Sequence, residues 1–160
     1  MAEIQSAAPE ALPIEERLNR RAQIGALEEF MKNDMAPEHR IEPVTNHYFA
    51  NGVYVREMIV PAGNIVIGKI HKAPHITILV QGKITITTEE GSQTIEAPLT
   101  LVAAPGMKRV GYCHTDVIWH SVHHVGEERD LEKIEEALIA KTFDDPALAG
   151  DQLDKISEAA

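Results

Sequence analysis

Two histidines separated by three residues carry the clearest chemical signal in the chain. His71 and His75 lie at the junction of two β-type runs, and Gly82 follows as a turn residue. A helical pair is excluded because Pro74, between them, would break the turn. Neutral imidazoles bind first-row divalent metals, and they also transfer protons near neutral pH. The pair therefore indicates a metal site or a cluster of proton-transfer groups inside a β structure.

A third histidine is expected to join this pair. Alternate residues of a strand share a face, and one face of the run 117–124 carries Val117, Trp119, Ser121 and His123. His120 and His124 fall on the opposite face. If the face of His71 and His75 looks inward, His123 is the best-placed third ligand. We predict these three as ligands of Zn²⁺, Fe²⁺, Mn²⁺ or Ni²⁺, with a metal-free pocket equally compatible with the sequence.

Composition limits the elements that must position these residues. A chain of 160 residues with 44% hydrophobic and 4% aromatic residues is expected to form one domain with an aliphatic core. Its net charge of −10 disfavours nucleic-acid binding, which needs cations to neutralise phosphates. The single Cys113 fits a reducing compartment. Because no apolar run reaches the roughly 20 residues of a membrane span, we expect a cytoplasmic protein without membrane contact.

Hydrophobic periodicity divides the chain into three zones. Residues 1–46 read as a helical N-terminal extension, with a helix from Pro13 to about Lys32, followed by a linker over 33–46. Residues 127–160 read as a C-terminal helical segment, in which Asp130 caps a helix that ends near Lys141. A second, weaker amphipathic segment follows, with Leu148, Leu153 and Ile156.

The middle zone, residues 47–126, has the period of β-strands. Strands are expected at 53–60, 65–71, 75–80, 83–88, 93–96, 100–103, 108–113 and 117–124. Turn signals separate them, including Pro61, Gly82, Pro98 and Pro105. Short strands at such regular intervals indicate a mainly β antiparallel sandwich or barrel.

Two motifs in this zone resemble those of the cupin superfamily. The first cupin motif runs glycine, His-x-His, glutamate and glycine. Counting back from Gly82, His75 occupies the glutamate position, His71 the second histidine and Lys69 the first. The second motif matches around residues 104–109, with Arg109 in place of a histidine. The resemblance implies an antiparallel jelly-roll barrel with a pocket, although only His71 is retained among the usual metal ligands.

More narrowly, residues 50–140 resemble a group of short cupin proteins encoded by tailed bacteriophages. The matching residues are Gly68–His71, Thr94–Pro98, Pro105–Tyr112, Trp119 and His123. This resemblance implies a phage-encoded product, located in the host cytoplasm or in the virion.

Basic residues near these motifs suggest an anionic ligand. Lys69, Lys72, Lys108 and Arg109 come from the two regions that line a cupin pocket, in a chain that is otherwise acidic. We assign ligand binding to Lys69, Lys108, Arg109 and Trp119. The alternatives are solvated lysines at strand edges and an ion pair between Arg109 and Glu57.

Glu57 and Tyr112 are the candidate catalytic residues, and Tyr54 is a further candidate. A carboxylate or phenol opposite an imidazole could move protons on a bound sugar or acid, as in lyases and isomerases. The direction in which these side chains face is not fixed by the sequence.

Two functions remain open on this reading. The first is a small-molecule-binding protein with a His/Arg pocket, of which a metal-dependent lyase, isomerase or oxygenase acting on a small anion is one form. The second is a non-catalytic phage protein, either a virion or assembly component or a binder that sequesters a host anion or nucleotide. The helical extensions, which a minimal barrel does not need, favour a homo-oligomer in both cases.

Overall fold

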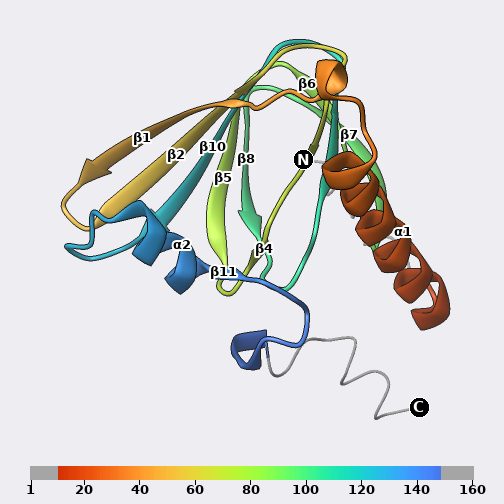
Figure 1. The fold of residues 1–160 in the computed structure, drawn as a ribbon. Helices are drawn as coiled ribbons and strands as arrows, with labels where there is room; N and C mark the ends of the chain where they lie inside the picture. The colour runs from red at the N-terminus through yellow and green to blue at the C-terminus, as the bar shows by residue number, and fades with distance from the viewer. Residues whose placement is uncertain (1–10, 149–160) are drawn as a thin grey trace, which may run out of the picture.

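Two antiparallel β-sheets dominate the computed structural model, which describes residues 11–148 (Figure 1). The first sheet has the order β1 (Val44–Ala50), β2 (Val53–Val60), β10 (Val117–His124), β5 (His75–Gln81) and β8 (Leu99–Ala103). The second has the order β3 (Ile65–Ile67), β9 (Val110–Cys113), β6 (Lys83–Thr88) and β7 (Gly91–Glu96). Strands distant in sequence are thus neighbours, as in a jelly roll. The predicted mainly β antiparallel jelly roll, with a helix at each end, is confirmed.

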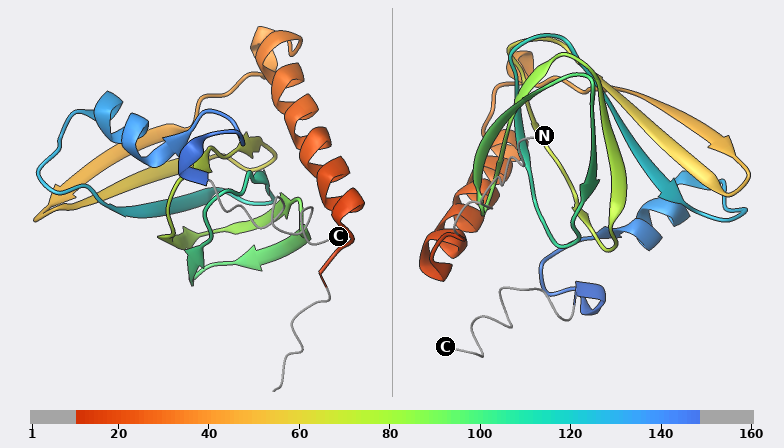
Figure 2. Two further views of the ribbon diagram at one scale, coloured as in Figure 1. Left: turned by 90° about the horizontal axis from the view of Figure 1, so that it is seen from below. Right: turned by 180° about the vertical axis from the view of Figure 1, so that it is seen from behind.

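The N-terminal helix, α1 (Ile14–Asn33), begins directly after Pro13 as the sequence predicts. It leads through the short 3₁₀ helix η1 (Pro37–His39) into β1. The Arg17 guanidinium lies 3.2 Å from the Glu89 carboxylate, at the β6–β7 turn, and both side chains are almost fully buried. Arg21 contacts the other oxygen of Glu89 at 2.7 Å. Two ion pairs therefore attach α1 beside the second sheet, where Figure 2 shows it.

The C-terminal segment returns across the molecule in three short elements. They are α2 (Leu131–Leu138), β11 (Ile139–Ala140) and the 3₁₀ helix η2 (Pro146–Leu148). Asp130 caps α2 as predicted, since its side chain accepts hydrogen bonds from the amides of Glu132 and Lys133. β11 pairs with β4 (Ile70–His71), so that Ile139 lies opposite His71. Within residues 11–148, neither helix is both long enough and apolar enough to cross a bilayer.

The strand boundaries agree with the sequence prediction at some positions and differ at others. β2, β6 and β10 match their expected ranges at both ends. The expected strand 65–71 is instead two strands, β3 and β4. The first strand starts at Val44, within the stretch predicted to be a linker. The predicted end of the C-terminal helix near Lys141 is wrong, because Ile139 and Ala140 pair with β4. Of the second C-terminal segment, Leu148 lies in η2, whereas Leu153 and Ile156 lie outside the described residues.

The aliphatic core fills one end of the space between the sheets. It consists of Val60, Leu79, Ile84, Ile95, Cys113 and Val117, with Trp119 packed against it. Farther along β5 and β10, the inward-facing residues become polar, beginning with the cross-strand pair Thr77 and Ser121. The other end of the sandwich is therefore not filled by apolar side chains and contains the pocket.

Candidate functional site

The three predicted histidines converge in this pocket. His71 comes from β4, His75 from the start of β5 and His123 from β10. Their ring centroids are 4.1 Å (His71–His75), 4.7 Å (His75–His123) and 5.3 Å (His71–His123) apart. One ligand nitrogen from each ring lies within 4.8 Å of the others. The structure thus brings together, from three different strands, the set that alternation predicted.

Burial keeps these imidazoles neutral. Burial, with smaller contributions from His75, His123 and Arg109, lowers the pKa of His71 to about 3. Burial, followed by His75 and Arg56, lowers the pKa of His123 to about 4. Burial also lowers the pKa of His75, partly opposed by a hydrogen bond to the Ala73 carbonyl. At neutral pH each ring therefore presents a lone pair, the form that binds a metal.

The donor set fits a divalent transition metal. The Nδ1 atom of His71 is buried and has no hydrogen-bond partner among the described residues, and such an orphaned atom is costly unless a ligand or ion satisfies it. His75 donates from Nδ1 to the Ala73 carbonyl at 3.5 Å, which leaves its Nε2 free. A tetrahedral ion with metal–nitrogen bonds of about 2.0–2.1 Å separates its ligand atoms by about 3.4 Å. The three imidazoles, with one nitrogen each within 4.8 Å of the others, are close to that spacing.

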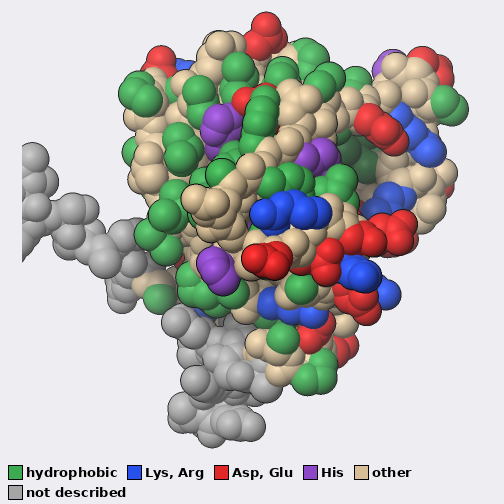
Figure 3. Space-filling model, turned by 90° about the vertical axis from the view of Figure 1, so that its left-hand side faces the viewer, with side chains coloured by type: hydrophobic (Ala, Val, Ile, Leu, Met, Phe, Trp, Pro, Cys, Tyr) green, Lys and Arg blue, Asp and Glu red, His purple; other side chains and the backbone are tan. Residues whose placement is uncertain are grey.

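The cavity around the histidines is large enough for a small organic ligand, with a volume of about 690 Å³. Figure 3 shows a hollow in the surface with charged side chains of both signs at its edge. Leu131, Ile134 and Leu138 of α2 line one side of the cavity, and Trp119 lines another. The site is thus a mainly apolar cavity with a few polar groups, as is typical of small-molecule sites.

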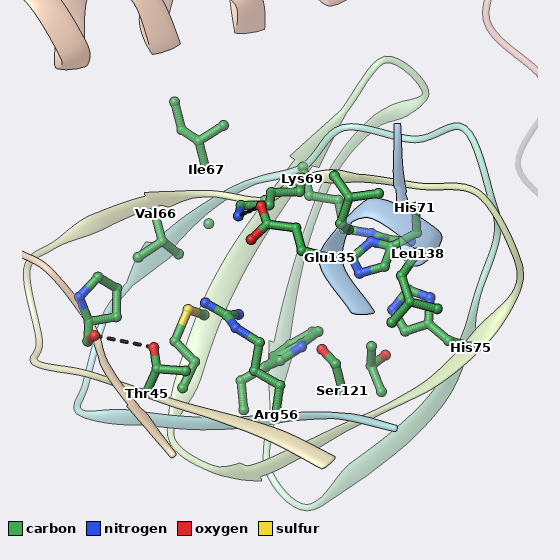
Figure 4. A pocket seen from close by; sticks show the side chains of 18 of the residues that line it. Thr45, Arg56, Val66, Ile67, Lys69, His71, His75, Ser121, Glu135 and Leu138 are labelled. Carbon is green, nitrogen blue, oxygen red and sulfur yellow. Dashed lines mark hydrogen bonds and ion pairs between the residues drawn. The ribbon is translucent and has the colours of Figure 1, made fainter. Parts of the chain in front are cut away.

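Four basic side chains line the same cavity, and they differ in their partners. Lys32 forms an ion pair with Glu28 of α1. Lys69 forms an ion pair with Glu135 of α2 across the cavity (Figure 4). Arg56, on β2, and Arg109, in the β8–β9 loop, have no ion pair with a carboxylate of the described residues. Burial lowers the pKa of Arg109, which nevertheless stays a cation at neutral pH. Two guanidinium groups are therefore available for an anionic ligand.

Glu57 lies on the other face of the first sheet. Its carboxylate accepts hydrogen bonds from Asn46 at 2.9 Å and Tyr48 at 3.3 Å, and it pairs with His120 at 2.7 Å. Because Arg56 and Glu57 are neighbours on β2, one points into the pocket and the other away from it. The structure therefore brings Glu57 neither to the histidines nor to Arg109.

Tyr112 and Lys108 are also outside the cavity lining. Tyr112 is exposed on β9, and its ring meets that of His114 edge to face. Lys108 forms an ion pair with Glu28 of α1. Of the predicted ligand-binding and catalytic residues, Lys69, Arg109, Trp119 and the further candidate Tyr54 line the pocket.

Tyr54 is the tyrosine that the structure places beside the histidines. It is 4% exposed, its ring stacks on His123 with centroids 6.1 Å apart, and its hydroxyl lies 2.7 Å from Nδ1 of His47. Burial raises the pKa of Tyr54, so the phenol is protonated at neutral pH. The tautomer of His47 sets which of the two groups donates in their hydrogen bond. A proton-carrying pair therefore adjoins the cluster.

Sequence reasoning missed Arg56, His47 and the contribution of α2 to the pocket. Arg56 is two residues from Tyr54 and thus shares its face, which is a signal that alternation could have used once Tyr54 was placed inside. The position of α2 depends on the pairing of β11 with β4. No local sequence pattern indicates that β11 pairs with β4.

Comparison with known proteins finds matches among solved structures only, each at low sequence identity. No protein-family model matches the chain, and no curated protein matches it either. Among solved structures, a Klebsiella pneumoniae protein with a double-stranded β-helix domain is 17% identical, with a TM-score of 0.47, and the match covers 69% of this chain and 95% of that one. A cupin domain from Bordetella pertussis is 17% identical, with a TM-score of 0.44, covering 53% and 95%. An RmlC-like cupin family protein from Methanocaldococcus jannaschii is 11% identical, with a TM-score of 0.44, covering 57% and 87%. Neither ligand nor activity follows from these similarities.

Proposed function

We propose that this chain is a cupin-type small-molecule-binding protein in which His71, His75 and His123 hold a divalent metal. The observation that carries the proposal is the convergence of three buried, neutral imidazoles, one of which has an orphaned Nδ1. Three protein nitrogens leave open positions on the ion, as in catalytic rather than structural sites. A bound ion there supplies Lewis acidity to a ligand oxygen.

The ligand is a small anion. Arg56 and Arg109 line the same cavity and have no carboxylate partner within residues 11–148, and guanidinium binds carboxylate or phosphate through two parallel hydrogen bonds. The apolar residues of α2 cover the remainder of the ligand. With an ion at the histidines and the arginines close by, an anionic group is attracted to this end of the pocket.

Catalysis is one form of this function. Tyr54 and His47 can hold and move a proton beside the ligand, a part for which Glu57 and Tyr112 are badly placed. A lyase, isomerase or oxygenase reaction would use such a pair differently, and the geometry favours none of the three. The resemblance to bacteriophage proteins, and with it the non-catalytic alternative of a virion component or sequestering binder, stays a prediction from sequence.

Metal content tests the proposal directly. Protein purified without a polyhistidine tag and dialysed without chelator should carry close to one divalent ion per chain by plasma mass spectrometry. His71→Ala and His123→Ala should lose most of it. His114→Ala is the matched control, because His114 is exposed and bonds to Thr85 away from the cavity. A wild-type protein that stays metal-free after incubation with Zn²⁺, Fe²⁺, Mn²⁺ and Ni²⁺ would refute the metal site.

A further inference from the structure

The side of the first sheet that faces away from the pocket is unusually apolar for a solvent-exposed surface. The strand register places Val44, Tyr48, Val53, Ile76 and Val102 on this side, which we call the outer sheet face. Val80 joins them because it follows the inward-facing Leu79 on β5. All six are among the exposed large hydrophobic residues, and Val102 is 77% exposed. They come from β1, β2, β5 and β8 and therefore span the sheet from edge to edge. An apolar surface of this extent in a water-soluble fold marks an interaction site.

Charge is nearly absent from the same face. Charged residues make up 25% of the chain, yet Glu57 is the only Asp, Glu, Lys or Arg among the outward-facing residues of these five strands. Its carboxylate is already satisfied by Asn46, Tyr48 and His120, all on the same face. The outer sheet face thus has a polar centre that needs no partner, surrounded by apolar residues. Depletion of charge is typical of the buried centre of protein interfaces.

The helices leave this face open. α2 lines the pocket, on the inner side of the sheet, and α1 is attached at the β6–β7 turn of the second sheet. Figure 2 shows both helices away from the outer side of the five-stranded sheet. No described element therefore prevents a flat partner from approaching.

We propose that the outer sheet face packs against the same face of a second copy of this chain. Two chains of net charge −10 repel each other over most of their surfaces, and a nearly uncharged face is where they can meet at least cost. Five strands about 4.8 Å apart, with about seven residues each at about 3.3 Å, give a plan area of roughly 550 Å². Side-chain relief raises the accessible area above that value, into the range of roughly 600 Å² per partner at which stable interfaces begin.

Face-to-face packing of two such sheets has the geometry of a β-sandwich interior. Two β-sheets pack about 10 Å apart through interdigitated aliphatic side chains, and the outer sheet face presents mainly valine and isoleucine. The contact is isologous, since the same patch serves both copies and closes the assembly as a dimer. The pocket stays on the far side of each sheet, so the dimer does not depend on the metal.

Light scattering on the purified full chain tests the dimer. The wild type should have twice the mass of one chain at micromolar concentration. Val102→Glu adds two like charges to the interface and should reduce the mass to that of one chain. Because Val102 is 77% exposed in the single chain, the variant should keep the circular-dichroism spectrum of the wild type. Ile76→Lys, on the strand paired with Val102, should have the same effect and covers the case in which Val102→Glu fails to fold.

Leu18→Glu is the matched control, since Leu18 is 48% exposed but lies on α1. It should leave the dimer intact. A monomeric wild type, or a dimer that survives both substitutions on the sheet, would overturn the proposal. A dimer that dissociates only with Leu18→Glu would also overturn it and would assign the interface to the helical extension.

Discussion

At the scale of single residues, a side chain of the pocket could be assigned from sequence only where the two faces of its strand carry different kinds of residue. His71, His75 and His123 were found because imidazoles at these spacings have few roles on adjacent strands. The facing of Glu57 stayed open because β2 is apolar on both of its faces, and alternation alone therefore does not say which face is inward. Arg56 was missed for the same reason. The structure resolves the ambiguity: on one face of β2, Met58 and Val60 pack in the core, and Tyr54 and Arg56 line the pocket.

The neutral histidines make the stability of the protein depend on pH. The pKa of His71 is about 3 in the fold, against an ordinary value near 6.5, so the unfolded chain binds more protons between these values. Stability is therefore complete above about pH 6.5 and is lost as the pH falls toward the folded pKa. At about 1.36 kcal/mol per pH unit, the suppressed titration of His71 alone lowers the free energy of unfolding by roughly 2 kcal/mol between pH 7 and pH 5.

Urea unfolding with chelator present at pH 7, 6 and 5 measures this dependence. His71→Gln should flatten the profile because it removes one of the suppressed titrations, whereas His114→Gln should keep the wild-type slope. An unchanged slope in His71→Gln would show that the imidazole is not held neutral.

At the scale of elements, sequence patterns predicted the boundaries of those strands that end at turn residues. β2, β6 and β10 have clean alternation between turn residues and match their predicted ranges. The failures occur where distant segments meet. Ile139 continues the helical pattern of α2, yet it pairs with His71 as a strand. The hydrogen bond from the Lys72 amide to the Leu138 carbonyl, 2.8 Å long, reinforces that ending. Ile139 and Ala140 therefore pair with β4 instead of extending α2 by another turn.

The turn between β5 and β6 requires glycine at position 82. The φ of Gly82 is +96°, and a Cβ there would collide with the Asp116 carbonyl oxygen. Gly63 has a similar φ of +78°, but a Cβ there would have open space. Gly63→Ala should therefore cost about 1–2 kcal/mol from backbone strain alone. Gly82→Ala should cost about 1–3 kcal/mol more, from the clash. Chemical denaturation measures both, and equal losses would contradict the collision.

At the scale of the whole molecule, the pocket exists only once every part of the fold has assembled. β2 supplies Arg56, the β8–β9 loop supplies Arg109, and α2 closes one side. These parts are separated by dozens of residues in sequence. No window of the chain contains the anion site, and this is why the sequence indicated an anionic ligand through Arg109 without finding its companion.

Binding of a small dianion tests whether the two arginines act together. Isothermal titration with malonate should show weaker binding to Arg56→Met and to Arg109→Met by roughly tenfold or more, since a charged hydrogen bond contributes about 1.5–3 kcal/mol. The loss should shrink as salt is added, because the attraction is electrostatic. Lys83→Met is the matched control: it removes one positive charge from an exposed position outside the cavity lining.

If all three variants lose affinity for malonate equally, the net charge of the protein rather than a built site attracts the anion. If neither arginine variant loses affinity, the guanidinium groups do not bind it. A loss confined to Arg56 and Arg109 is the result that the arrangement of this pocket requires.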